Sequence, residues 1–418
     1  MKEPDTLDEI FEKFAGDATI FKDREVLRHD YLPERLPHRE QQIRGLAETV
    51  APVLKGARSS NILIYGKTGT GKTAVAKHVL SRVEFKAKEF NAAVKFCYVN
   101  CRLAGSEYRV FANLCQSIGH SVPFTGLSVG EVFDRFKLGL DSRRVIFMVI
   151  LDEADALIKN RGDSLLYELT RINESLAHSK VSLVCISNDL RLKEFLDSRV
   201  LSSLSEEEIV FGPYDAAELR NILLERSREA FLDGVLSDAA LGLCAALAAA
   251  EHGDARRALD LLRVAGEVSE RQGATTVMED HVREAEKNIE HNRVAEALHN
   301  LTVHSKLVVL SLYHLHRVNV GAAVTGDIYE VYTELSNEAG LAPLTQRRLC
   351  TLVNELDTMG LFNARIVNMG RYGRTKKIRL DSPRTLIKDV FAGDSRIGRL
   401  VDYEPKCLQE RGVRKKNN

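Results

Sequence analysis

The chain has 418 residues, of which 44% are hydrophobic and 28% are charged, and its 59 Lys and Arg balance its 59 Asp and Glu. This length exceeds what one hydrophobic core usually organises, so we expect three domains in a globular protein. The longest apolar run is VIFMVIL at 145–151, the N-terminus has no apolar signal core, and the seven cysteines are scattered without CxxC spacing. A membrane span, an export signal, a disulfide framework and a zinc site are therefore not indicated, and we expect a soluble, cytoplasmic chain with free thiols.

The stretch NILIYGKTGTGKTAVAKHVL at 61–80 predicts a short buried strand, a GxxxxGK[ST] phosphate loop (Walker A) and an amphipathic helix. The glycines allow successive backbone N–H groups to face phosphates at a helix N-terminus. Lys72 would reach the β and γ oxygens of ATP, and Thr73 would ligate Mg²⁺. The nucleotide-binding residues predicted in the loop are Gly66, Lys67, Thr68, Gly69, Thr70, Gly71, Lys72 and Thr73.

The segment SEYRVFANLCQSIGHSVPFTGLSVGEVFDRF at 106–136 is longer than a simple crossover between strands needs. Ser128 and Glu131 have the spacing of a capping box, which predicts a helix start there. VPFTG at 122–126 is therefore expected in a loop between two helices.

The run VIFMVILDEADAL at 145–157 predicts a strand buried on both faces that ends in Asp152 and Glu153. Asp152 would hold the water shell of Mg²⁺, and Glu153 would orient the attacking water as general base; alternatively, the two acids only cap the next helix. The next apolar strand, SLVCISND at 182–189, ends in Asn188, which would touch the γ-phosphate or its water, or would be an ordinary turn residue. The alternation of strands and helices to about residue 212 predicts a parallel βαβ sheet.

An Ala-rich, wholly helical region is predicted at 214–290, and within it GDARRALDLL at 253–262 begins an apolar helix with two arginines. The order of phosphate loop, acid pair, strand-end Asn and helical lid with GDAR resembles the AAA+ ATPases. The resemblance implies that Arg256 senses the γ-phosphate. Arg257 would face solvent, although spacing alone does not decide which of the two arginines points inward.

The segments YLPERLPHREQQIRGL (31–46), RVLSSLSEEEIVFGPY (199–214) and GPYDAAELRNILLERSREAF (212–231) narrow the resemblance. Together they resemble the archaeal origin-recognition and replication-initiator proteins, relatives of the eukaryotic origin recognition complex, over nearly the whole chain. This resemblance implies that the first of these segments, together with Tyr214 and Arg226, lines an adenine pocket. Without it, Tyr214 reads as a core aromatic at a domain junction and Arg226 as a charge on a helix surface.

Two further features are implied by the same resemblance. The loop at 122–126 corresponds to an initiator-specific insertion that approaches DNA, although a plain loop packed by its Phe is an alternative. Some members of the wider family place arginines at both of the positions that Arg199 and Ser203 occupy here, and one of them acts on a neighbour's ATP. Because only Arg199 is present in this chain, activation by an adjacent subunit is not predicted. The DNA-binding candidates in the insertion are Pro123, Phe124, Thr125 and Gly126.

From Leu301 the pattern changes to three helices and a hairpin, and residues 301–418 carry 19 Lys and Arg against 12 Asp and Glu. The third helix is expected to start at a Thr345 cap and to bury Leu349, Leu352, Val353 and Leu356. This helix would serve as a recognition helix, and the N-terminal residues of its outer face would meet base edges or phosphates. The candidates on this helix are Gln346, Arg347 and Arg348.

A hairpin turning near NMGRYG completes a predicted winged helix. Six positive side chains and no carboxylate lie between Arg365 and Arg379, which favours contact with phosphates or a minor groove. Strand alternation puts Ile378 and Leu380 inward and Lys377 and Arg379 outward. The wing candidates are Arg371, Tyr372, Arg374 and Lys377.

The predicted fold class is α/β: a RecA-like AAA+ parallel-sheet domain at 1–212, an all-α lid domain at 213–295 and a winged-helix domain at 296–418. The residues predict an ATPase with ATP or ADP and Mg²⁺ as cofactors, which binds duplex DNA and no membrane. The resemblance implies a replication initiator that acts at origins, recruits an MCM-type replicative helicase and meets other copies of itself on DNA. A remodeller or loader of protein partners, with a wing that docks protein, is the alternative.

Overall fold

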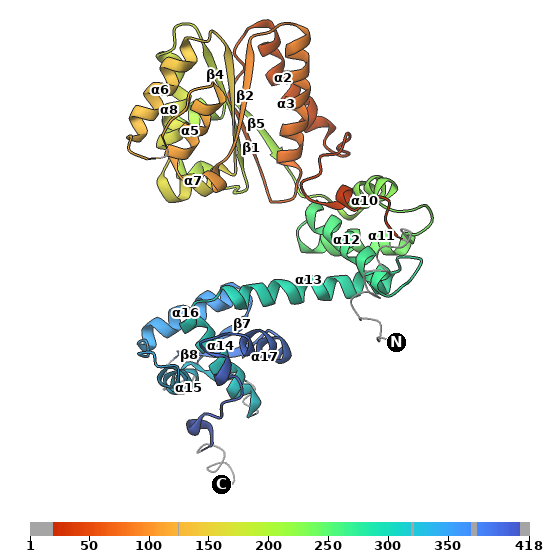
Figure 1. Ribbon diagram of the computed structural model, residues 1–418, viewed down its shortest axis with the longest axis vertical. Coiled ribbons are helices and arrows are strands. Elements are labelled where there is room, and N and C mark those ends of the chain that lie inside the picture. The colour runs from red at the N-terminus through yellow and green to blue at the C-terminus, as the bar shows by residue number, and fades with distance from the viewer. Residues whose placement is uncertain (1–19, 124, 319–321, 369–373, 410–418) are drawn as a thin grey trace, which may run out of the picture. The chain divides into compact units, whose positions relative to one another are not determined.

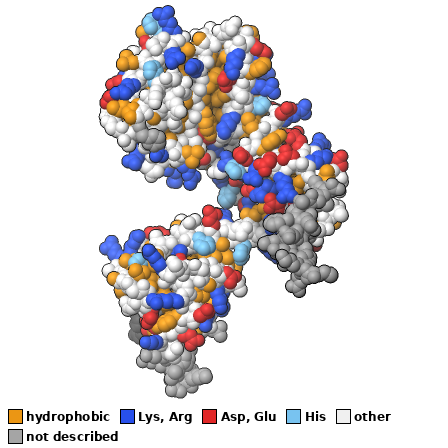
Figure 2. Space-filling view, in the orientation of Figure 1, with side chains coloured by type: hydrophobic (Ala, Val, Ile, Leu, Met, Phe, Trp, Pro, Cys, Tyr) orange, Lys and Arg blue, Asp and Glu red, His pale blue; other side chains and the backbone are white. Residues whose placement is uncertain are grey.

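The computed structural model describes residues 20–123, 125–318, 322–368 and 374–409. By contacts between residues, the chain divides into two compact units, residues 1–285 and 286–418. On the face of the first unit that Figure 2 shows, charged side chains are scattered over the sheet part, and positive and negative ones lie next to each other over the lid part. No helix in the described ranges is both long and apolar enough to cross a membrane.

The first unit contains a five-stranded sheet in the order β2-β3-β4-β1-β5. All neighbouring strands are parallel, which confirms the predicted α/β class. Helices cover both faces of the sheet, with α2 and α3 on one face and α5, α6 and α8 on the other (Figure 1). The strands are β1 (Ile62–Gly66), β2 (Val94–Asn100), β3 (Ile146–Asp152), β4 (Lys180–Ser187) and β5 (Glu207–Phe211).

Local sequence sets where the helices of the sheet region begin. Ser106 and Ser128 cap α5 and α6, each accepting a hydrogen bond from the backbone N–H three residues on, as such side chains do at helix starts. The helices are α2 (Glu40–Val50), α3 (Lys72–Glu89), α4 (Cys101–Ala104), α5 (Glu107–Ser117), α6 (Val129–Asp141), α7 (Ala154–Arg161), α8 (Ser164–Arg171) and α9 (Ser198–Leu204).

The lid follows β5 and belongs to the same compact unit as the sheet. Asp215 and Glu218 form a capping box at the start of α10, and Asp254 caps α12. Helix α10 packs on α11 and α12, and the short 3-10 turn at Glu25–Leu27 packs against α10 and α12. The lid helices are α10 (Ala216–Ala230), α11 (Asp238–Glu251), α12 (Ala255–Arg271) and the first part of α13 (Glu279–Asn300).

The second unit is a winged helix built around an apolar core. Leu349, Leu352, Val353 and Leu356 are buried on α16, as its spacing predicts. Two additions were not predicted: the two-residue strand β6 pairs with β8 to make a three-stranded sheet, and α17 follows the hairpin. The elements are α14 (Val303–Arg317), β6 (Ala323–Val324), α15 (Thr325–Glu338), α16 (Gln346–Thr358), β7 (Phe362–Asn368), β8 (Arg374–Leu380) and α17 (Arg384–Ala392).

Candidate nucleotide site and nucleic-acid interface

The phosphate loop joins the end of β1 at Gly66 to the start of α3 at Lys72. Gly69 and Gly71 adopt left-handed backbone angles, with φ of 75° and 90°. A side chain at Gly69 would also collide with Asp254, the cap of lid helix α12. The loop is therefore compact enough for the lid to touch it, and its backbone ends at a helix N-terminus, where anions bind.

Lys72 is buried at the base of this loop, with 4% of its surface exposed. Its Nζ donates hydrogen bonds to the backbone oxygens of Gly66 (2.9 Å) and Lys67 (2.6 Å). Burial, and next the charge of Arg256, lowers the pKa of Lys72 to about 8. Because an adjacent polyphosphate favours the charged form, it would raise this pKa again.

Asp152 ends β3 and is 3% exposed. Its Oδ2 accepts hydrogen bonds from Thr73 Oγ1 (2.9 Å) and from Tyr98 OH (2.6 Å), and its Oδ1 accepts one from the backbone N–H of Glu153 (2.9 Å). A hydroxyl and a carboxylate this close offer the hard oxygen ligands that Mg²⁺ prefers, so the residues fit that ion. The motif did not reveal Tyr98, which lies 54 residues before Asp152.

Glu153 caps α7 in a left-handed conformation, with φ of 52°, and its side chain makes no cap hydrogen bond. The alternative in which this acid only caps the helix is therefore not supported by its contacts. Its Oε2 lies 3.8 Å from Arg102 Nη1, a cation that is 77% exposed. Glu153 lines the same cavity as Lys72 and Thr73, where a general base would have to lie.

Asn188 follows β4, which lies between β3 and β1 in the sheet. Its backbone N–H donates to Asp155 Oδ1 (2.9 Å), and the same oxygen lies 3.3 Å from Ser187 Oγ. Asp155 thus holds the chain at the tip of β4 so that Asn188 lines the cavity. No sequence motif predicted this role of Asp155.

The two lid arginines differ in their contacts. Arg257 pairs with Glu251, through Nε to Oε2 at 3.0 Å and Nη2 to Oε1 at 3.1 Å. Arg256 is exposed, lines the cavity and is close enough to Lys72 to lower its pKa. The structure therefore brings Arg256, not Arg257, to the phosphate loop.

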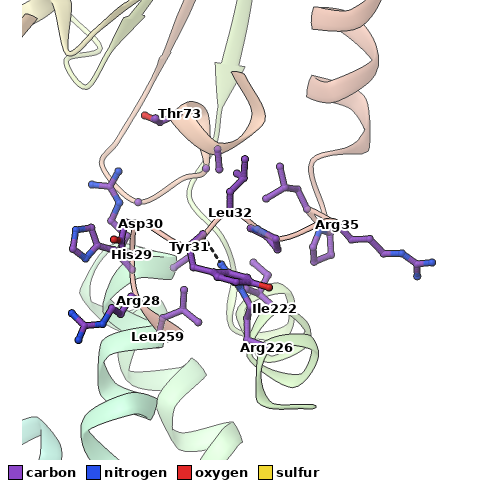
Figure 3. A pocket seen from close by; sticks show the side chains of 18 of the residues that line it. Arg28, His29, Asp30, Tyr31, Leu32, Arg35, Thr73, Ile222, Arg226 and Leu259 are labelled. Carbon is purple, nitrogen blue, oxygen red and sulfur yellow. Dashed lines mark hydrogen bonds between the residues drawn. The ribbon is translucent and has the colours of Figure 1, made fainter. Parts of the chain in front are cut away.

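A cavity of about 520 Å³ continues from the phosphate loop to the lid. Figure 3 shows its wall at residues 28–35, which pass between Thr73 and the lid residues Ile222, Arg226 and Leu259. Tyr214 and Arg226 both line it, and its volume is within the range of small-molecule sites. The structure thus places the two predicted adenine-pocket residues in one cavity with the phosphate loop.

Arg226 is buried, so its alternative reading as a helix-surface charge is wrong. Its Nη1 donates to Val26 O (3.0 Å) and its Nη2 to Tyr31 O (3.2 Å), and the guanidinium lies 4.6 Å from the centre of the Tyr31 ring. Tyr214 is also buried, at the junction between β5 and the lid. Both readings of Tyr214 therefore agree with its position.

Arg199, the candidate for acting on a neighbouring subunit, lies in the first turn of α9. Its Nε donates to Asp197 Oδ1 (3.1 Å), and its side chain is 73% exposed. Ser203 Oγ donates to Arg199 O (3.1 Å). Both residues thus lie on one helix, and each has a local hydrogen-bond partner.

The insertion loop joins α5 to α6, as the capping box predicts. Pro123, Thr125 and Gly126 are exposed, and Phe124 lies outside the described residues. The Tyr108 hydroxyl donates to the backbone oxygen of Pro123. This bond anchors one end of the loop to α5 and leaves its exposed side chains open to solvent.

Helix α16 presents a polar outer face. Arg347 lies opposite the buried leucines by helical spacing, and Gln346 and Arg348 are exposed on its flanks. Arg348 Nη1 lies 3.7 Å from Glu355 Oε1. The Lys376 ammonium of β8 donates to Asn354 Oδ1, so the hairpin is tied to the outer face of α16 by a contact that the sequence did not predict.

The hairpin β7–β8 has the predicted alternation, because Ile378 is buried while Lys377 and Arg379 are exposed. Arg365 lies directly across from Lys377, and like charges opposite each other destabilise a sheet. No carboxylate of the described residues forms an ion pair with either cation. Arg371 and Tyr372 lie outside the described residues, and only the backbone of Arg374 is described.

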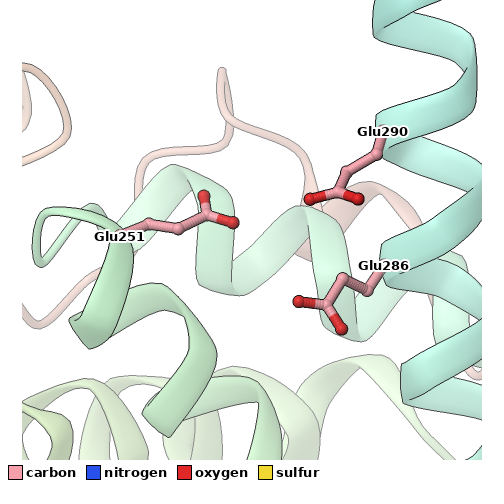
Figure 4. A group of neighbouring side chains, drawn as sticks. All are labelled: Glu251, Glu286 and Glu290. Atoms are coloured by element: carbon pink, nitrogen blue, oxygen red, sulfur yellow. The ribbon is translucent and has the colours of Figure 1, made fainter. Parts of the chain in front are cut away.

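Three further carboxylates lie away from these sites. Figure 4 shows Glu251 at the end of α11, and Glu286 and Glu290 on successive turns of α13. The boundary between the two compact units falls between Glu251 and the other two acids. Glu251 already pairs with Arg257, and no cation site is assigned to these acids.

Comparison with known families matches three segments of the chain. Residues 57–194 match an AAA domain, residues 220–287 the Cdc6 AAA+ ATPase-type lid domain, and residues 296–390 the CDC6 C-terminal winged helix domain. The chain is 49% identical over 395 residues to an ORC1-type DNA replication protein of Thermococcus onnurineus, covering 94% of this chain and 95% of that protein.

Two further similarities extend over nearly the whole chain. An ORC1-type DNA replication protein 1 of Sulfurisphaera tokodaii is 47% identical over 397 residues, covering 95% of this chain and 99% of that protein. The structure of the Aeropyrum pernix ORC1 protein in complex with DNA is similar with a TM-score of 0.83 at 48% identity, covering 92% of this chain and all of that one.

Proposed function

Since the chain belongs to the family of ORC1-type DNA replication proteins, we propose that it is an ATP-dependent initiator that binds duplex DNA at replication origins. The observation that carries the DNA-binding part is the pair Arg365 and Lys377, two exposed cations fixed side by side without a carboxylate. DNA phosphates would neutralise this repulsion. The similar Aeropyrum pernix protein has been solved in complex with DNA, which supports the proposal.

The recognition helix and the insertion loop complete the proposed DNA interface. Arg347, exposed opposite the core of α16, would contact base edges or phosphates. The hydrogen bond from Lys376 to Asn354 would fix the position of the hairpin against that helix. The remaining contacts that we propose are Gln346, Arg348, Arg371, Tyr372, Arg374 and Lys377 in the winged helix, and Pro123, Phe124, Thr125 and Gly126 in the insertion.

ATP would act as a switch with slow hydrolysis. The phosphate loop and Lys72 would bind the phosphates, the cavity at Tyr214 and Arg226 would hold the adenine, and Thr73 and Asp152 would hold Mg²⁺. The ion would neutralise charge on the transferred phosphate. Glu153 would accept the proton of the attacking water, Asn188 would orient that water, and Arg256 would contact the γ-phosphate and close the lid.

The resemblance to the family motivates two wider proposals about the switch. We propose that the nucleotide state sets whether the DNA-bound protein recruits an MCM-type helicase, and that copies of the chain meet on DNA. The proposed domains are residues 1–212, 213–295 and 296–418. The rival function, a loader of protein partners, requires that the wing dock protein instead of DNA.

The two functions are separated by duplex binding measured in a gel. Duplex from intergenic regions of the protein's own genome should shift at lower protein concentration than random duplex of equal length and composition. The initiator function predicts at least a tenfold difference, since specific binding exceeds non-specific binding by more than that. If neither duplex shifts at moderate salt while a protein partner binds the wing, the rival is correct.

The lid arginines provide a matched pair of variants. Arg256→Ala should retain ADP affinity but lose the preference for ATP, because only ATP offers the terminal phosphate that Arg256 would contact. Arg257→Ala removes the same charge from the next residue and should leave the preference intact, since its guanidinium pairs with Glu251. Titrations with ATP and ADP measure both, and a loss confined to Arg257→Ala would contradict the assignment.

A further inference from the structure

Arg39, just before α2, is a buried cation that the nucleotide motifs do not include. It is 5% exposed, and no carboxylate of the described residues forms an ion pair with it. Its Nε donates to Thr70 O in the phosphate loop (2.9 Å), its Nη2 to Gly212 O between β5 and the lid (2.8 Å), and its Nη1 to His38 O (3.1 Å). One guanidinium thus joins the phosphate loop to the entrance of the lid.

Two aromatic rings complete its surroundings. The guanidinium lies 3.7 Å from the centre of the Tyr214 ring and 5.6 Å from that of Phe211. Ring faces and carbonyl oxygens both carry partial negative charge. They stabilise the buried cation without the ion pair that a carboxylate would form, so its charge lies next to the phosphate loop.

The bond to Thr70 O also sets the direction of a backbone donor. Because a peptide unit is planar and trans, its C=O and N–H point in opposite directions. Holding Thr70 O on the Arg39 side therefore aims the N–H of Gly71 away from Arg39. The preceding peptide is held in the same way, because Ala255 N of the lid donates to Gly69 O (3.1 Å).

We propose that Arg39 is a positioning residue for the phosphates of the bound nucleotide. It fixes the phosphate loop so that Gly71 N–H faces the phosphates, it ties the loop to the lid entrance, and it places a buried charge near them. This inference rests on the proposed nucleotide site. Because the loop serves the phosphates shared by ATP and ADP, Arg39 contributes equally to both, unlike Arg256.

The test compares Arg39→Gln and Arg39→Lys with Arg44→Gln, a change to an exposed arginine of α2 that pairs with Glu48. Arg39→Gln should lower the affinities for ATP and ADP alike by roughly ten- to a hundredfold, which is the effect of losing a charged hydrogen bond. Arg39→Lys keeps the charge and should recover part of this loss, while Arg44→Gln should bind as the unaltered protein does. Affinities come from nucleotide titration, and Tm is measured with and without saturating ADP.

A positioning role and a purely structural role give different results. The positioning role predicts that the rise in Tm caused by ADP shrinks in both Arg39 variants. If Tm without nucleotide falls but ADP affinity stays within twofold of the unaltered protein, the inference is wrong. Should Arg39→Gln fail to fold, the ADP affinity of Arg39→Lys decides in the same way. If the unaltered protein and Arg44→Gln bind no ADP, the proposed nucleotide site fails instead.

Discussion

Replacing Lys72 with alanine should lower the affinity for ATP and ADP at least a hundredfold. The Lys72 ammonium is buried at the base of the loop, where charge interactions are stronger than in water. Its two present acceptors are backbone carbonyls, which a phosphate would replace with full negative charge. Titration with a fluorescent nucleotide measures the loss, and Lys86→Ala, an exposed lysine on the same helix, is the control. An affinity unchanged by Lys72→Ala would show that the phosphate loop does not bind the nucleotide.

Glu153→Gln should affect hydrolysis and not binding. The variant should bind ATP at nearly the affinity of the unaltered protein but hydrolyse it at least a hundredfold more slowly. Glutamine keeps the size and a hydrogen-bonding oxygen but cannot accept a proton from water. Single-turnover hydrolysis with excess enzyme measures the chemical step apart from binding. Hydrolysis at the parental rate in this variant would show that another group is the general base.

The nucleotide motifs could be predicted because each is a continuous stretch whose strand or helix context is also local. The phosphate loop needs the preceding strand and the following helix, and both are readable within 20 residues. The contacts that support these motifs join distant segments. Tyr98 reaches Asp152, and Arg39 reaches Gly212, 173 residues away, and no local period encodes such pairs.

In the winged helix, too, the local features could be predicted and the contacts between distant segments could not. The Thr345 cap and the buried leucines of α16 follow from helical spacing, and Thr345 does accept a hydrogen bond from Arg348 N. The strand β6 has only two residues, too few for an alternating pattern to be visible. The sequence also did not show which of Arg256 and Arg257 faces the phosphate loop, because the rotation of α12 depends on the contact of Arg257 with Glu251 in another helix.

Changing Arg365, Lys377 and Arg379 together to alanine should weaken duplex binding for all sequences and flatten its salt dependence. Each phosphate contact contributes about −0.9 to the slope of log affinity against log salt, so the slope should become less steep by about two to three. Affinity measured at several salt concentrations gives the slope. Tm should not fall and should rise slightly, since the variant removes the repulsion between Arg365 and Lys377.

The matched control is Lys388→Ala, Arg396→Ala and Lys406→Ala, which removes the same charge from exposed positions of the same unit. It should leave the salt slope nearly unchanged. Equal flattening by both triple variants would mean that net charge, and not the hairpin, determines binding. An unchanged affinity and slope in the hairpin variant would favour the protein-docking function.

The central claim, that nucleotide and DNA binding serve initiation at origins, is tested most directly by footprinting the ATP-bound protein on DNA from its own genome. We expect protection of a few discrete intergenic sites. Arg347→Ala should weaken binding at those sites more than binding to random duplex, and the hairpin triple variant should weaken binding to all sequences. Uniform protection along the genome, or none at any salt concentration, would contradict the assignment of this chain as an origin-binding initiator.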